Sequence, residues 1–220
     1  MMFRNKIRVY TAAKRAKVFF QYIESLGKPV RLLDIGGTFA FWERMGLRQE
    51  HQLSVSLLNN HHIDKSQIDY SPCYDYIDNV YGDANELTRT DFANYDVVFS
   101  NSMLEHLDSK TSQERLTAEI LASGKPFFIQ VPNKYSLIDP HFPHPFVPFF
   151  AAYPKTLQTR LLTIGAFGGG EKYRSLEQAR ERFKYYNPIS RGQIRKLLPP
   201  AHIITERHLG IPMSIIAMRE

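Results

Sequence analysis

The feature of this sequence that most constrains its fold is a series of short apolar runs, each closed by a glycine or a polar residue. The runs lie at Val30–Ile35, Gln52–Leu58, Ile77–Tyr81, Asp96–Ser100 and Phe127–Val131. Their ends are roughly 20 to 30 residues apart, which is the length of a strand, a crossover helix and the connecting loops. Nearly continuous apolar runs are typical of strands that are covered on both faces. The series therefore predicts a parallel sheet with helices on both of its faces.

The remaining segments complete this α/β pattern. Helices are predicted at Lys110–Ser123, Lys155–Ile164, Ser175–Tyr186 and Ser190–Leu198. Two further strands are predicted at Ile203–Glu206 and Ser214–Met218. The predicted fold class is thus a Rossmann-like, doubly wound, mostly parallel sheet of seven strands.

The length of 220 residues and the hydrophobic share of 43% bound the domain organisation. They favour one α/β domain with an appended segment over two full domains. We expect a helical segment over residues 1–29 and a domain over 30–220, in which 134–188 form a lid or insertion on the substrate side. Cys73 is the only cysteine, so the chain can form no internal disulfide and no thiolate cluster for a metal. This is typical of a reducing cytosol, and we expect a cytoplasmic protein.

The start of the chain is strongly basic, because residues 1–31 carry eight Lys and Arg residues against one Glu. Apolar residues recur at helical spacing between Ala12 and Ile23, which predicts a helix capped by Thr11 and ended by Gly27. We interpret its basic residues as a solvated face. No nucleic-acid-binding motif accompanies them, so no nucleic-acid partner is expected. Contact with the inner face of an anionic membrane stays open as an alternative.

Polar clusters follow the predicted strands, at the sheet edge where ligands bind in open α/β folds. The first cluster contains Asp34, Gly36, Gly37 and Thr38. Glycines directly after a strand let the backbone approach a ligand closely. Asp34 would repel the pyrophosphate of a nicotinamide dinucleotide, whereas it suits a cationic ligand. An oxidoreductase is therefore disfavoured.

Three later clusters follow the next strands along the chain. They are Asn59-Asn60, Gly82-Asp83-Ala84, and the stretch from Asn101-Ser102 to Glu105-His106-Leu107. Together with the first cluster, they resemble the motifs of class I S-adenosylmethionine-dependent methyltransferases of the bacterial, small-molecule type. The resemblance extends over roughly residues 30–218 and implies an antiparallel final strand, S-adenosylmethionine as the cofactor and a small or lipid-linked acceptor.

The resemblance also implies roles for single residues. Asp83 would accept a hydrogen bond from the adenine amino group, and the backbone amide of Ala84 would contact the ring. Asn59 and Asn60 would bind the ribose, and Asn101 with Ser102 would line the methionine end. The sequence departs from the family pattern at three places: Thr38 and Ala40 replace two glycines, and Asn59 replaces an acid. These departures motivate an alternative, a non-catalytic protein that kept the fold.

Methyl transfer from a sulfonium is an in-line displacement that needs alignment and exclusion of water rather than a metal. A hydroxyl or amine acceptor also needs a base, and histidine has a suitable pKa. His106 and His141 are the candidates for this catalytic role. The pair His141 and His144 lacks a third ligand, so no metal site is expected.

The segment Pro140–Pro154 interleaves five prolines with aromatic residues, which suits neither a core strand nor a core helix. We interpret it as a lid or docking surface for an apolar or lipid-linked acceptor, or for a membrane edge. The alternative is that its rings pack against the helix predicted at Lys155–Ile164 and form a local core.

Overall fold

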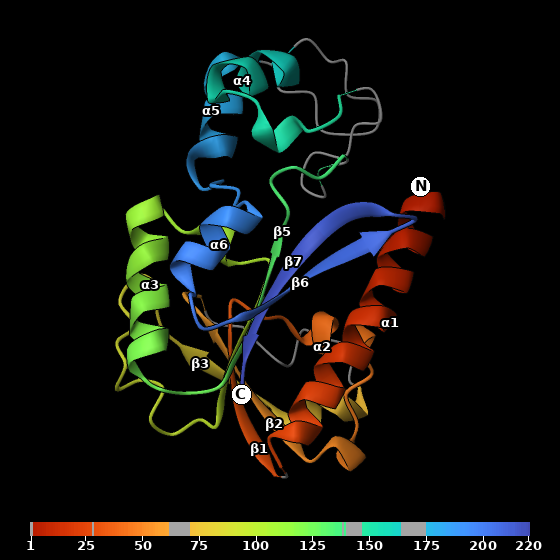
Figure 1. The fold of residues 1–220 in the computed structure, drawn as a ribbon, viewed down its shortest axis with the longest axis vertical. Helices are drawn as coiled ribbons and strands as arrows, with labels where there is room; N and C mark the ends of the chain where they lie inside the picture. The colour runs from red at the N-terminus through yellow and green to blue at the C-terminus, as the bar shows by residue number, and fades with distance from the viewer. Residues whose placement is uncertain (1, 28, 62–70, 138, 140–146, 164–174) are drawn as a thin grey trace.

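The computed structural model describes residues 2–27, 29–61, 71–137, 139, 147–163 and 175–220 (Figure 1). Within these ranges a single sheet contains seven strands, in the order β3-β2-β1-β4-β5-β7-β6. Strand β7 runs antiparallel to both of its neighbours, and the other pairs are parallel. The strands are β1 (Val30–Ile35), β2 (Leu53–Asn59), β3 (Ile77–Tyr81), β4 (Val97–Asn101), β5 (Phe127–Pro132), β6 (His202–His208) and β7 (Ile211–Arg219). This confirms the predicted fold class.

Helices cover both faces of the sheet (Figure 1). Helices α1 (Met2–Ser25) and α2 (Phe39–Met45) share a core with one face. Helices α3 (Lys110–Ala122) and α6 (Arg191–Leu197) pack on the other, while α4 (Lys155–Thr163) and α5 (Leu176–Lys184) lie above the carboxyl ends of the strands. Four short 3₁₀ helices complete the described elements: η1 (Gln49–His51), η3 (Pro72–Tyr76), η4 (Leu104–His106) and η5 (Phe150–Ala152).

The predicted start of the first helix at Thr11 is wrong, because α1 begins at Met2. Residues before Thr11 include Arg and Lys, which have high helix propensity, so the helix extends past the expected cap. One face of the second half of α1 is buried. Phe19, Tyr22 and Ile23 lie in one core with β1, α2, β4 and β5, and the Phe19 ring contacts the rings of Phe99 and Phe128 at centroid distances of 5.0 and 5.3 Å.

The crossover from β3 to β4 is a chain of turns over residues 82–96 rather than a helix. Side chains of α3 hold it in place. The guanidinium of Arg115 donates to the carbonyl oxygens of Ala84, Asn85 and Leu87, and the Glu119 carboxylate accepts from the backbone N–H of Arg89 at 2.8 Å. Hydrogen bonds from a neighbouring helix thus replace the internal bonds that a crossover helix would supply.

A separate satellite cluster lies over the carboxyl edge and consists of Phe150, Ala151, Leu162, Ala179, Phe183 and Tyr186. It includes part of the proline-rich segment, of which residues 140–146 lie outside the described residues. Phe150 is fully buried and Tyr153 packs against the cluster, whereas Phe149 is 45% exposed. The interpretation as a local core therefore holds for Phe150 and Tyr153.

Candidate functional site

A row of polar side chains crosses the sheet where the apolar core of the α1 face ends. Leu32, Phe99 and Phe128 belong to that core. Because side chains two residues apart on a strand point to the same face, the next residues on this face are polar. They are Asp34 on β1, Asn101 on β4, Gln130 on β5, Ser214 on β7 and Glu206 on β6. The row lies at the carboxyl edge, where open α/β sheets bind ligands.

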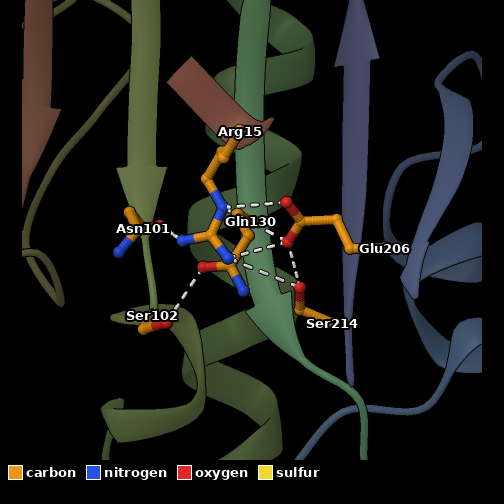
Figure 2. A network of polar contacts seen from close by, with 6 residues as sticks. All are labelled: Arg15, Asn101, Ser102, Gln130, Glu206 and Ser214. Carbon is orange, nitrogen blue, oxygen red and sulfur yellow. Dashed lines mark hydrogen bonds and ion pairs between the residues drawn. The ribbon is translucent and has the colours of Figure 1, made fainter. Parts of the chain in front are cut away.

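Arg15 of α1 joins several of these residues into one network (Figure 2). Its Nη2 lies 2.7 Å from Oε2 of Glu206, and its Nε also donates to that carboxylate. Nη1 donates to Oδ1 of Asn101 at 2.6 Å, and Ser214 donates to Glu206. The side chains of Arg15 and Glu206 are only 14% and 10% exposed. Such a shielded, bidentate pair is ordered and weakly screened, unlike a pair at the surface.

Ser102 is bound to Gln130, another residue of the polar row. Its Oγ donates to Oε1 of Gln130 at 2.9 Å, and its backbone N–H donates to the Gln130 carbonyl at the same distance (Figure 2). Ser102 has a φ of 55°, in the left-handed region. The chain therefore turns sharply after β4. Of the predicted pair, Asn101 is bound to Arg15 and Ser102 to Gln130.

Asp34 is fully buried beside the glycine turn. Its Oδ2 accepts a hydrogen bond from Nε1 of Trp42 at 2.8 Å, while Oδ1 has no partner among the described residues. Burial raises the pKa of Asp34 to about 7, and the Trp42 hydrogen bond opposes that rise. A Cβ on Gly37 would overlap the Asp34 carboxylate, so only glycine fits there.

The rest of the turn is held by local contacts. Thr38 caps α2, because its Oγ1 accepts from the backbone N–H of Phe41 at 3.3 Å. Gly36 has a φ of 78°, which glycine adopts without strain. Asn59 donates from Nδ2 to the Gly37 carbonyl at 3.1 Å, which brings the ends of β1 and β2 together. Asn60 is exposed, and its side chain contacts only that of His61 among the described residues.

Asp83 follows β3 and borders a cavity of about 330 Å³. One carboxylate oxygen, Oδ1, accepts from the backbone and side-chain N–H groups of Asn85 at 2.8 and 3.0 Å. The cavity extends under the β3–β4 crossover to Leu33 and Leu58, which belong to the α3 face. It therefore lies beside the polar row, not within it. Ala84, the neighbour of Asp83, is fixed through its carbonyl by α3.

His106 lies in η4, directly after the β4 turn. Its Nδ1 is 3.0 Å from the Tyr185 carbonyl oxygen, and its Nε2 is 4.0 Å from Oε1 of the buried Glu105. The ring is 35% exposed. Asn187 holds the same segment, because it donates to the carbonyl oxygens of Glu105 and Leu107. The other candidate base, His141, lies outside the described residues.

Comparisons with known proteins were made by sequence and by structure. No protein-family model and no curated protein matches the sequence. The CurJ carbon methyltransferase has a similar structure, with a TM-score of 0.54 and 15% identity over 94% of this chain and 53% of that one. The chain has the fold of the class I S-adenosylmethionine-dependent methyltransferases.

Two further solved structures are similar to the chain. EvdMO1 matches with a TM-score of 0.51 and 12% identity, over 94% of this chain and 40% of that one. A possible exported protein from Bordetella parapertussis matches with a TM-score of 0.50 and 14% identity, over 94% and 67%. The chain thus spans about half the length of CurJ and less of EvdMO1. Among its described residues, no helix is both long and apolar enough to cross a membrane.

Sequence reasoning did not identify the residues that tie α1 to this methyltransferase fold. Arg15 was counted with the basic residues of a solvated face, and Glu206 lies 191 positions away from it. A local signal was present in the sequence. Arg15 precedes Phe19 by four residues and Tyr22 by seven, so it lies on the buried face of the helix, where a charge needs a partner.

Proposed function

We propose that this chain is an S-adenosylmethionine-dependent methyltransferase that acts on a small or lipid-linked acceptor. The observation that carries the proposal is the orphaned Oδ1 of Asp34 next to Gly36 and Gly37. A buried carboxylate oxygen without a partner is unfavourable, and a ligand cation at the carboxyl edge would satisfy it. The methyl donor has such a cation in its ammonium group.

Other residues fit the remaining parts of the donor. Asn59 uses Nδ2 on the Gly37 carbonyl, so its Oδ1 is left to accept from a ribose hydroxyl. Asp83 uses Oδ1 on Asn85, so Oδ2 is left to accept from an adenine amino group. When bound, S-adenosylmethionine supplies a methyl group that its sulfonium has already activated. The chain's own residues would orient the donor and exclude water.

His106 is the proposed acceptor of the substrate proton. A carbonyl oxygen can only accept, so contact with the Tyr185 carbonyl places the ring proton of neutral His106 on Nδ1. In this tautomer Nε2 is the basic nitrogen of the ring. The Glu105 carboxyl at 4.0 Å would stabilise the imidazolium that results.

Two observations bear on the acceptor and the compartment. Phe149, Leu157 and Leu176 in and near the satellite elements are each 44–45% exposed, which supports an apolar or lipid-linked acceptor at that end of the sheet. The basic start of the chain supports peripheral contact of a cytoplasmic protein with an anionic membrane.

One specific observation favours the second candidate, a non-catalytic protein with this fold. Oδ1 of Asp34 is buried as well as unpaired, and Trp42 closes over the other oxygen. A ligand reaches Asp34 only if the glycine turn or α2 moves. The motif departures at Thr38 and Asn59 point in the same direction, since Thr38 is used as a helix cap.

Calorimetric titration distinguishes the two candidates. We expect S-adenosylmethionine and S-adenosylhomocysteine to bind with micromolar dissociation constants, corresponding to about −8 kcal/mol, and NAD to give no heat. NAD is the control because it shares the adenosine group and lacks the amino-acid end. Absence of binding by both methionine-derived ligands would leave the non-catalytic candidate.

A further inference from the structure

The orientation of the Asn101 amide is fixed by Arg15. A guanidinium has only donors, so the Asn101 atom that faces Nη1 at 2.6 Å must be the oxygen Oδ1. Figure 2 shows Nδ2 of Asn101 directed away from Arg15. No group in the described part of the chain accepts a hydrogen bond from this Nδ2. Asn101 therefore presents two unused N–H donors at the carboxyl edge.

These donors lie close to the orphaned acid of β1. Strands β1 and β4 are paired neighbours, with Asp34 opposite Phe99. Asn101 is two residues further along β4, so its side chain is on the same face, roughly 6–7 Å further toward the edge. A carboxylate on one strand and paired N–H donors on the next are complementary to the ammonium and the carboxylate of an α-amino acid.

Arg15 itself is not available to bind an anion. Its Nε and Nη2 are directed at the Glu206 carboxylate, and Ser214 completes that group. The charge of Arg15 is thus neutralised within the network. What Arg15 contributes to the polar row is the hydrogen bond from Nη1, which sets the direction of the Asn101 amide.

We infer that Arg15 is a positioning residue, which orients Asn101 so that its Nδ2 binds the carboxylate at the amino-acid end of the methyl donor. Asp34, which is fully buried in this structure, takes the ammonium of the same group once the glycine turn or α2 has moved. The inference rests on the proposed function, and it assigns to the basic N-terminal helix a part in donor recognition. It also explains why an arginine lies on the buried face of α1, next to Ala16 and Phe19.

The substitution Asn101→Asp tests whether the Asn101 side chain must donate hydrogen bonds to the ligand. The new carboxylate still accepts from Arg15, so the fold should be as stable as that of the native chain in thermal unfolding. It has no donors and would repel the donor's carboxylate. We expect about a 10- to 100-fold loss of affinity for S-adenosylmethionine in calorimetry. The affinity for 5′-methylthioadenosine, which lacks the amino-acid end, should not change.

Arg15→Lys is the second variant. A lysine keeps the charge opposite Glu206 but cannot reproduce the planar fork that also reaches Asn101. We expect a smaller loss for S-adenosylmethionine and again none for 5′-methylthioadenosine. Arg31→Met is the matched control, because Arg31 forms an exposed pair with Asp96 at the start of the same two strands. It should change neither affinity.

The ratio of the two affinities decides the inference. If the network has only a structural role, the variants should lose affinity for both ligands to the same extent. That result, or an unchanged ratio of the two affinities in Asn101→Asp, overturns the inference and leaves the proposed function intact. If the native chain binds neither ligand, the proposed function fails and the inference with it.

Discussion

Asp34 couples the candidate site to the stability of the fold. Its side chain is fully buried with one hydrogen bond from Trp42, and burial raises its pKa from 3.8 in the unfolded chain to about 7. The folded protein therefore binds a proton at Asp34 that the unfolded chain has already released. Between these two pKa values the contribution of Asp34 to stability falls as the pH rises, and above about 7 it is fully lost.

Asp34→Asn should remove this dependence. An amide keeps the acceptor for Trp42 and carries no charge, so the stability of the native chain relative to the variant should fall by about 2 kcal/mol between about pH 5.5 and 8.5. Urea unfolding of both proteins at the two pH values measures this difference. Asp96→Asn is the control: Arg31 lowers the pKa of Asp96, so this carboxyl is ionised in both the folded and the unfolded chain at the two pH values, and the stability difference between Asp96→Asn and the native chain should stay constant. If the stability difference between Asp34→Asn and the native chain is the same at both pH values, burial does not raise the pKa of the Asp34 carboxyl.

At the residue scale, the sequence was informative where contacts are local. Asp34, Gly36 and Gly37 were predicted together because a glycine turn after a strand is visible in a few consecutive letters. The partner of Asp34, Trp42, lies eight residues further on in α2, and the pair Arg15–Glu206 spans almost the whole chain. Helical spacing places Arg15 on the buried face of α1, but the identity of its partner depends on the completed topology, so no local pattern indicates Glu206.

At the scale of elements, the β3–β4 crossover depends on one side chain of α3. Arg115 donates to three carbonyl oxygens of the turn that follows Asp83. Arg115→Met should leave these carbonyls to water, with a loss of roughly 1–3 kcal/mol of local stability and faster hydrogen exchange over residues 84–89. Exchange measured by mass spectrometry on the native chain and the variant tests this.

Arg89→Met supplies the control for that experiment. The Arg89 side chain is exposed and makes no hydrogen bond or ion pair with the described residues, while its backbone N–H is held by Glu119. The variant Arg89→Met should leave hydrogen exchange in the crossover unchanged. Equal exchange in the native chain and Arg115→Met would show that the turns hold themselves in place.

The sequence predicted the bounds of β3 and β4, the strands that this crossover joins, to within one residue, because apolar runs mark strands. The turns between them are fixed by a distant arginine and have no periodicity in the sequence.

At the scale of the whole molecule, the contacts of the N-terminal helix show whether residues 1–29 are an appended segment or part of the domain core. The sequence predicted them as an appended basic helical segment, because they precede the first predicted strand and carry seven Lys and Arg residues against one Glu. In the structure, Phe19 is fully buried and its ring contacts those of Trp42, Phe99 and Phe128, which come from α2, β4 and β5. Composition cannot show this, because a helix with one apolar face and several basic residues has the composition of a surface helix whether or not it is part of the core.

Phe19→Ala tests whether α1 and the sheet unfold as one unit. Removal of a fully buried ring should lower the free energy of unfolding by about 3–5 kcal/mol in a single transition, which urea titration followed by circular dichroism and tryptophan fluorescence would measure. Lys17→Ala, on the exposed side of the same helix, should stay within about 0.5 kcal/mol. Coincident transitions would mean that the helix carrying Arg15 is as stable as the sheet edge it contacts. An early loss of helix signal, with Trp42 still buried, would instead show that α1 separates from an otherwise intact domain.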